Sequence, residues 1–554
     1  MAALPHRRRL RAAGHGRARR RLPGLLLHLA RPNPLWRALA ADPHDVLALT
    51  GDYAYVEAAW NANLAPTRRW AALPCRGRRR LPRAGGDPGV GGPPARVGRV
   101  TELRDDTVRK LHRTVLDRQR AGRIPGLFAG VVRDGGLVWQ EGVGSADLAD
   151  PAVPPDADHQ FLIASNTKTF TAVLVMALRD EGRLSLDDTL DTFVPEVTQR
   201  GLTIRQCLAH VSGMQREPLG DVWETLVNPD TAELVSGFNQ AERVHRPHHV
   251  WHYSNLVFSM LGEVVARLDA RPWAESLRAR ILDPLEMRRT TVGFAPSTGP
   301  GQRGGRVQGY YVPPWTDVPV PQDQLDLRAL NPCGGLASTG ADMARWSAFV
   351  ADPVAEVLAP ATLEEMCEPQ VVMDRERWTA AMGLGFFLVR SGTRTYVGHT
   401  GGMPGHITAV FTDREAKTGG VVLTGSGSTP DVAGFATTLA DLVTNHEPLD
   451  PEPWRPGTAV PPELAELVGV WYSEGSPFVF SVRQGGLEAR AEGQPEHKPA
   501  SRFEQVSPDL FRTVAGREHG ELLRVTRDAA GQVTKMNWAT YLVTRQPLAF
   551  GEWL

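Results

Sequence analysis

Strand patterns at both ends of a long helical stretch limit the folds that the middle of this chain can adopt. Residues 126–132 and 137–143 are typical of a hairpin around the turn Asp134-Gly135-Gly136. Three more strand patterns follow far downstream, at 395–398, 407–412 and 421–424. Strands at both ends with helices between them favour one sheet built from both ends of the domain and covered by a helical region.

Helical periodicity precedes the hairpin and fills much of the sequence after it. Residues 105–120 predict an amphipathic helix with apolar positions at Val108, Leu111, Val115 and Leu116. Further helical patterns lie near 166–182, 203–210, 254–267, 273–282 and 341–350. We therefore predict an α+β fold for residues 101–446, with an antiparallel sheet, flanking helices and a helical subdomain.

A proline-rich segment, residues 447–462, separates this domain from the C-terminal part of the chain. It contains six prolines and is predicted to be a semi-rigid linker. Short strand patterns with turns between them follow, at 478–482, 487–491, 510–513, 522–526 and 533–538. Residues 463–554 therefore predict a small antiparallel β-barrel, and they contain no cluster of catalytic residue types.

The first 100 residues differ from the rest in charge and composition. They hold 19 arginines, no lysine and 5 acidic residues, a formal charge of about +14, although the whole chain is neutral. Residues 1–23 and 74–99 are rich in Arg, Gly and Pro without hydrophobic periodicity, and we expect them to be disordered. Because the segment has no basic helical face and no interleaved aromatic residues, a nucleic-acid partner is not predicted.

Targeting and redox signals in the sequence are weak. No apolar run approaches the ~18 residues needed to cross a bilayer, and the arginine-rich start is followed by no signal-peptide core or cleavage site. The four cysteines are widely spaced and form no CxxC pair, so neither a zinc site nor a disulfide framework is predicted. We expect a cytoplasmic protein that acts on a small molecule without a metal or cofactor.

Ser165-Asn166-Thr167-Lys168 is the first motif that carries chemistry. It lies where an extended segment meets a predicted helix, and positions three apart share a helical face, so the hydroxyl and the amine can meet. Serine needs a neighbouring base to act as a nucleophile. The chain has 62 Lys and Arg residues, but only five of them are lysines. This usage indicates that Lys168 has a role that a guanidinium could not fill, and it argues against an ordinary exposed lysine.

Two further motifs supply partners for this pair. Tyr253 and Asn255 begin another helical pattern, where a phenol can shuttle protons and an amide can orient the lysine and the substrate. His399-Thr400-Gly401-Gly402 follows a strand; its glycines let a substrate approach the backbone, and its N–H groups can complete an oxyanion hole with that of Ser165. Alone, Tyr253 would be interpreted as a core aromatic and His399 as part of a surface turn.

In this order the motifs resemble those of the class C β-lactamase and D-alanyl-D-alanine carboxypeptidase family, which also contains esterases and aminopeptidases. Matching stretches at 181–188, 208–213, 283–287 and 334–339 extend the resemblance over roughly residues 101–445. It implies a β-lactamase/transpeptidase-like fold in which Ser165 is acylated and Lys168 and Tyr253 form the general base pair. It also implies substrate contacts from Asn255, His399, Thr400, Gly401 and Gly402.

Resemblances also extend to both ends of the chain. Gly469-Val470-Trp471-Tyr472 is similar to the start of the lipocalin-like module often appended to such hydrolases. Residues 28–36 and 51–56 resemble a fragment of the FMN-binding split-barrel proteins described as negative transcriptional regulators. We interpret residues 1–100 as holding a remnant of such a barrel, which is not expected to bind flavin because its sheet edges would be unpaired.

One departure from the family pattern limits the substrate prediction. Typical β-lactamases have lysine at the position of His399, where a fixed charge recognises the substrate carboxylate, whereas histidine is mostly neutral at pH 7. We therefore expect hydrolysis of small esters or amides to exceed that of penicillins. The alternatives are a penicillin-binding receptor or carboxypeptidase that is acylated with little turnover, and a vestigial hydrolase beside a ligand-binding barrel.

Other side chains near the motifs have simpler interpretations. Four histidines precede Tyr253 with a spacing that fits no common zinc pattern, so no metal site is predicted; they are His245, His248, His249 and His252. His210 is expected to pack in a structural turn. Residues 295–330, rich in Gly and Pro with several aromatic residues, are predicted to form a rim of the substrate cleft.

Overall fold

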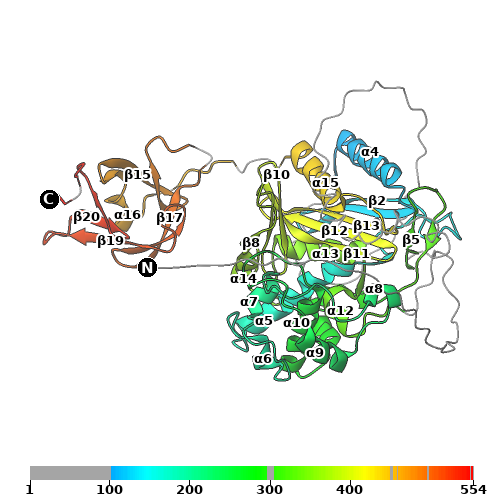
Figure 1. Cartoon of the computed structure of the whole chain (residues 1–554). Helices are drawn as coiled ribbons and strands as arrows, with labels where there is room; N and C mark the ends of the chain where they lie inside the picture. The colour runs from blue at the N-terminus through cyan, green and yellow to red at the C-terminus, as the bar shows by residue number, and fades with distance from the viewer. Residues whose placement is uncertain are drawn as a thin grey trace, which may run out of the picture. The chain divides into compact units, whose positions relative to one another are not determined.

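The computed structural model describes residues 102–295, 305–448, 453–457, 459–495, 498–549 and 551–552. The predictions of disorder and of a split-barrel remnant in residues 1–100 lie outside these ranges. The chain divides into two compact units, Met1–Leu449 and Asp450–Leu554, and the division falls inside the predicted proline-rich linker. Figure 1 shows the elements of each unit.

An eight-stranded antiparallel sheet is the framework of the first unit. Its strands are β1 (Gly126–Arg133), β2 (Gly136–Gly144), β8 (Val371–Val372), β9 (Ala380–Met382), β10 (Phe387–Ser391), β11 (Arg394–Met403), β12 (His406–Asp413) and β13 (Thr418–Thr424). The order β2-β1-β13-β12-β11-β10-β9-β8 places the hairpin beside the last strand of the domain. The prediction of a sheet built from both ends of the domain is therefore confirmed.

The turn of the hairpin explains how β1 and β2 come to be paired. Asp134 and Gly135 have φ values of 48° and 83°. Two consecutive left-handed residues give a turn whose twist matches that of the flanking strands, and Asp-Gly is a preferred sequence for it. The predicted hairpin and its turn are both confirmed.

Helices cover both faces of this sheet, which explains why its central strands are apolar at successive positions. α15 (Val432–His446) packs on β12 and β13 with α4 (Asp105–Gly122) beside it, and α13 (Gly340–Ala351) packs on β1 and β13 (Figure 1). Leu127 and Phe128, neighbours on β1, belong to two separate apolar cores. Because neighbouring strand residues point to opposite faces, a strand covered on both sides must be apolar throughout.

The prediction of the apolar face of α4 is confirmed for two of its four residues and wrong for the other two. Leu111 and Val115 are buried in α4, but Val108 and Leu116 are 37% and 39% exposed. The buried stripe runs instead through Thr107, Leu111 and Val115. It is narrow because α4 lies on the outside of the unit, where it packs against α15 and β2.

A helical subdomain and two small sheets complete the first unit. The helices are α5 (Thr167–Asp180), α6 (Leu190–Phe193), α7 (Ile204–Leu208), α8 (Val222–Thr225), α9 (Thr231–Gln240), α10 (Asn255–Asp269), α11 (Trp273–Leu277), α12 (Asn331–Gly334) and α14 (Pro360–Met366). The small sheets contain β3 (Gln160–Leu162), β7 (Leu336–Thr339) and β4 (Thr291–Val292), and β5 (Tyr310–Tyr311) and β6 (Val320–Pro321). The helix predicted at 273–282 is divided, because a π-helical turn, Arg278–Leu282, follows α11.

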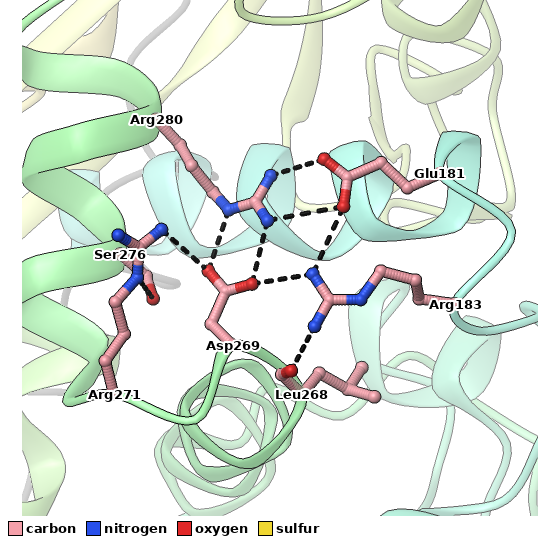
Figure 2. Close-up of polar contacts among 7 residues, drawn as sticks. All are labelled: Glu181, Arg183, Leu268, Asp269, Arg271, Ser276 and Arg280. Atoms are coloured by element: carbon pink, nitrogen blue, oxygen red, sulfur yellow. Dashed lines mark hydrogen bonds and ion pairs between the residues drawn. The ribbon is translucent and has the colours of Figure 1, made fainter.

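A network of charges joins the ends of α5 and α10 (Figure 2). The Asp269 side chain, only 2% exposed, accepts hydrogen bonds from Arg183, Arg271 and Arg280. Glu181, just after α5, contacts two of these arginines, at 2.5 Å from Arg280 and 3.2 Å from Arg183. Burial acts to raise the pKa of Asp269, but hydrogen bonds from Arg280, Ser276 and Arg183 hold it well below its usual range.

The second unit is a closed antiparallel barrel, which confirms the predicted C-terminal fold. Its strands follow chain order: β14 (Gly469–Ser473), β15 (Ser476–Arg483), β16 (Gly486–Ala491), β17 (Ser501–Ser507), β18 (Leu510–Ala515), β19 (Leu522–Arg527), β20 (Val533–Trp538) and β21 (Tyr541–Thr544). Its interior is filled by apolar side chains such as Trp471, Phe480 and Trp538. Trp471 donates to the Leu467 carbonyl at 2.7 Å, which ties the segment before β14 to the core.

None of the helices in the described part of the chain combines the length and the apolar character needed to cross a bilayer.

Candidate active site

Ser165 lies in a short 3-10 turn, η1 (Ala164–Asn166), between β3 and α5. Ala164 has a φ of 47°, in the left-handed region that non-glycine residues seldom adopt. The Asn166 side chain holds the turn against the sheet by donating to the Ile163 carbonyl and to Thr408 Oγ1, at 3.1 and 3.0 Å. The serine thus lies just before α5, at the predicted junction of an extended segment with a helix, and it is half-buried.

Lys168, in the first turn of α5, is fully buried and directed at the serine. Its Nζ lies 3.2 Å from Ser165 Oγ, 2.6 Å from Asn255 Oδ1 and 2.6 Å from the Cys333 carbonyl oxygen. The amide and carbonyl oxygens can only accept, so they take two N–H groups. The third position around the nitrogen faces Ser165 Oγ: a charged amine would donate its remaining N–H there, and a neutral amine would present its lone pair.

Tyr253 and Asn255 reach the same place from the start of α10. Ser254 caps this helix, since its Oγ accepts the Val257 N–H at 3.3 Å. Lys168 Nζ lies 4.7 Å from the centroid of the Tyr253 ring, so the lysine meets the face of the tyrosine. The structure therefore brings together the side chains of the first two motifs, with Asn255 bonded to the lysine and Tyr253 packed on it.

The third motif lies on an edge of β11 that faces η1. β10 ends opposite Gly398, so within the described residues no strand pairs with that side of β11 from His399 to Met403. A Cβ at Gly401 would lie 2.1 Å from the carbonyl oxygen of Ile163, which shows how closely the residue before η1 approaches this strand. At Gly402 the nearest atom to such a Cβ would be 3.4 Å away, so the backbone there is less crowded.

His399 is part of the wall of the site. It is 1% exposed, its ring stacks on Phe387 at 4.0 Å, and its Nδ1 contacts the Thr400 carbonyl. Its Nε2 is buried with no hydrogen-bond partner among the described residues. Burial, aided by the charge of Lys168, lowers the pKa of His399 to about 3, so this ring is neutral at physiological pH.

Two charged residues that the sequence patterns did not indicate also lie at the site. Arg216 places its guanidinium carbon 4.9 Å from the centroid of the Tyr253 ring, and Glu217 Oε1 accepts from Asn255 Nδ2 at 2.7 Å. Burial raises the pKa of Glu217, while Asn255 and Arg216 act in the opposite direction. No spacing rule points to this pair; the only sequence signal is two adjacent charges just after the turn at 208–213.

His210 supports Tyr253 from behind, as its predicted role in a structural turn suggests. It is fully buried with a φ of 54°, and its ring lies 4.4 Å from that of Tyr253. Its Nδ1 accepts the Ser254 N–H at 3.1 Å. Burial lowers the pKa of His210 well below its usual value.

The histidines before Tyr253 do not gather around a common point that could hold a metal. The ring centroid of His245 lies 5.1 Å from that of His252 and 6.4 Å from that of His249. Across the described ranges, no group of three or more His, Cys, Asp or Glu side chains is arranged to hold an ion.

Of the predicted cleft rim, residues 295–330, the structure describes residue 295 and residues 305–330. Tyr310 is buried there, and its hydroxyl bonds Asp147 Oδ1 and the Leu148 N–H, both at 2.9 Å. Trp315 is 76% exposed.

Comparison with protein families assigns a separate match to each part of the chain. Residues 108–445 match the beta-lactamase family, which covers more than half of the chain. Residues 460–545 match a domain of unknown function, and residues 15–86 match an FMN-binding domain. The resemblance to the lipocalin-like module therefore rests on residues 469–472 and agrees with the closed barrel, but the family match is to a different domain.

Two curated relatives share part of this sequence. Beta-lactamase-like protein 2 of Dictyostelium discoideum is 25% identical over 465 residues, which are 77% of this chain and 83% of that protein. Protein flp of Staphylococcus aureus is 28% identical over 195 residues, 34% of this chain and 39% of that protein.

Solved structures show the same fold. The octameric penicillin-binding protein homologue from Pyrococcus abyssi is similar with a TM-score of 0.54 and 20% identity, over 79% of this chain and 100% of that one. The D-amino acid amidase from Ochrobactrum anthropi SV3, solved with L-phenylalanine amide, gives a TM-score of 0.51 and 25% identity, over 62% of this chain and 98% of that one.

Proposed function

Because the chain belongs to the beta-lactamase family, we propose that it is a serine hydrolase in which Ser165 is acylated by a small ester or amide. One observation carries this proposal. Lys168 Nζ makes two short hydrogen bonds, to Asn255 Oδ1 and to the Cys333 carbonyl oxygen. The third position around the nitrogen faces Ser165 Oγ, which lies 3.2 Å away. A buried amine held in this way is suited to take the hydroxyl proton.

Acylation begins with proton transfer from Ser165 to Lys168. As the proton leaves, Oγ attacks the acyl carbon, and the carbonyl oxygen becomes an oxyanion stabilised by the N–H groups of Ser165 and Gly402. The lysine ammonium then returns the proton, through the Tyr253 hydroxyl, to the leaving alkoxide or amine. The C–O or C–N bond breaks, and the serine is left as an ester.

Deacylation repeats these steps with water in place of the serine. The Lys168 and Tyr253 pair removes a proton from the water, whose oxygen attacks the ester carbon. The carbon–Oγ bond then breaks, and the proton returns to Ser165 Oγ. The net reaction consumes one water and releases the carboxylic acid.

The absence of a charged side chain at His399 supports neutral substrates over penicillins. His399 is neutral because burial lowers its pKa to about 3, so the side chain at this position offers no fixed positive charge to a substrate carboxylate. Similarity to a D-amino acid amidase at 25% identity supports amino-acid amides within the amide class. We therefore propose that turnover of a small acyl ester or amide exceeds turnover of a penicillin.

Mass spectrometry after exposure to an activated ester or a fluorescent penicillin tests this function. We expect the mass of the acyl group on the peptide that contains Ser165, no adduct in Ser165→Ala, and faster steady turnover of the ester. An unmodified Ser165, or equal turnover of the penicillin, would refute the proposal. A product burst of one equivalent without further turnover would indicate an acylated receptor instead.

A further inference from the structure

The site contains a chain of three polar side chains that ends on a half-buried carboxylate. Lys168 Nζ donates to Asn255 Oδ1 at 2.6 Å, and Asn255 Nδ2 donates to Glu217 Oε1 at 2.7 Å. Within the described residues, these are the hydrogen bonds of the Asn255 side chain. The orientation of the Asn255 amide therefore depends on two partners, the lysine at its oxygen and the glutamate at its nitrogen.

An asparagine amide has an accepting and a donating end, and a half-turn about its last bond exchanges them. A lysine amine does not by itself choose between the two ends, because a neutral amine can donate to the oxygen or accept from the N–H₂ group. A carboxylate does choose, since it only accepts, and even a protonated carboxyl keeps one accepting oxygen.

We propose that Glu217 is a positioning residue that holds the amide of Asn255 with its oxygen toward Lys168. The proposal depends on the proposed function, because its consequence falls on the base of the reaction. With the oxygen toward Lys168, the amine donates to Asn255 and keeps its lone pair for Ser165. With the amide reversed, the lone pair would accept from Asn255 and the serine would lose its base.

The backbone around Glu217 is built to keep it in place. The Asn255 N–H donates to the Arg216 carbonyl at 2.7 Å, and Ser254 Oγ donates to the Gln215 carbonyl at 2.7 Å. The loop that carries Glu217 is thus fastened to the start of the helix that carries Asn255. The groups that act on the carboxyl are Arg216, whose Nε lies 3.6 Å away, the Lys168 charge, and the Trp223 side chain.

Two substitutions of nearly equal volume separate orientation from charge and from packing. Glu217→Gln removes the charge but can turn its own amide to offer an oxygen to Asn255. Glu217→Met removes the charge and the acceptor. We expect the rate constant for acylation by an activated ester to fall by about 10- to 100-fold in the methionine variant, with KM little changed, and to stay within about threefold in the glutamine variant.

A matched glutamate serves as the control. Glu224, exposed on α8, makes no side-chain hydrogen bond among the described residues. Glu224→Gln and Glu224→Met should both acylate at the wild-type rate. Equal losses in the two Glu217 variants would assign the effect to charge and overturn the proposal, and so would the absence of loss in both.

A double-mutant cycle tests whether Glu217 acts through Asn255. In an Asn255→Ala background, which has no amide to orient, Glu217→Met should cause no further loss of acylation rate. A full additional loss there would show that Glu217 acts by another route, and the proposal would be wrong. If wild-type Ser165 is not acylated at all, the proposed function fails instead, so the two failures are distinguishable.

Discussion

Burial keeps the histidines near Tyr253 uncharged. His210 and His399, whose rings contact Tyr253, are fully enclosed, as is His406 on β12, and burial is the largest cause that lowers the pKa of each. Lys168 is enclosed as well, but it has three polar partners arranged around its amine. At this scale the amine of Lys168 is surrounded by neutral polar groups and by histidine rings that burial keeps uncharged, while the charges of Arg216 and Glu217 lie beyond Tyr253 and Asn255.

Replacement of Lys168 by arginine should slow acylation of Ser165 strongly. A guanidinium keeps its proton at any accessible pH, so Ser165 would have no base, and a loss of about 10²- to 10⁴-fold is expected. Stopped-flow measurement of acylation by a nitrophenyl ester checks this. Lys417→Arg is the matched control, because Lys417 is exposed and pairs with Asp352 at 2.7 Å, and a near-wild-type rate in Lys168→Arg would contradict the role of Lys168.

The buried histidines should make the first unit sensitive to acid. His406 has its pKa lowered by burial to about 4, so between this value and about 6.5 the unfolded chain binds a proton that the folded chain does not. Stability from this residue is complete above pH 6.5 and is lost as the pH falls; the loss is about 2 kcal/mol at pH 5. Urea unfolding at pH 7.5, 6 and 5 measures it.

The variant His406→Gln isolates this effect. A glutamine does not titrate, so the free energy of unfolding should fall less steeply with decreasing pH than in wild type, by up to about 1.4 kcal/mol per pH unit. Identical slopes in the two proteins would show that His406 is not kept neutral by the fold.

Individual elements are tied together by polar contacts where their apolar faces end. α5 and α10 pack against each other in the helical subdomain. The hydrogen bonds and ion pairs around Asp269 connect the C-terminal ends of these two helices (Figure 2). α5 carries Lys168 and α10 begins at Asn255, so the relative position of these helices sets the distance between the two side chains. We therefore expect the network to help fix the relative position of these two helices.

Asp269→Asn should destabilise the first unit. The substitution leaves three arginines without their central anion, and a loss of about 2–4 kcal/mol in unfolding free energy is expected, since the arginines are partly exposed. Asp283→Asn is the control, because Asp283 and Arg278 are both more than 60% exposed and 3.9 Å apart, and it should cost less than about 0.5 kcal/mol. Equal losses measured by urea unfolding would contradict this account.

The whole molecule consists of two units with separate cores. The barrel core around Trp471 contains residues of the second unit alone, and the cores around Leu127 and Phe128 belong to the first. The strands of the second unit form a closed barrel, so their backbone groups pair within that unit. We therefore expect the units to unfold in two transitions.

Trp471→Ala should affect only one of these transitions. Trp471 is fully buried, with Arg545 stacked 3.9 Å from its ring centroid, and its truncation is expected to cost about 3–5 kcal/mol. Calorimetry should show one transition shifted to lower temperature, while acylation of Ser165 proceeds at the wild-type rate. Trp454→Ala, at an 81% exposed position, is the control, and a shift of both transitions would contradict independent units.

Much of the fold could be predicted because it depends on patterns among residues that are close together in the sequence. The hairpin at Asp134-Gly135 and the long apolar helices follow from turn chemistry and from period. α9 was missed, although Asp230 and Glu233 form a capping box that is visible in the sequence. β17 was missed because only Ser501 and Phe503 of its seven residues are buried, which is too few to show alternation.

By itself the sequence determined which chemical groups are present and how those on one element are spaced. Ser165 and Lys168 are three residues apart, and a single helical turn brings them together. Only the tertiary structure decided what surrounds the lysine, because its partners Asn255 and Cys333 are 87 and 165 residues away. Glu217 belongs to the same category: nothing local relates a loop carboxylate to the amide of a later helix, and the contact exists because packing brings the two segments together.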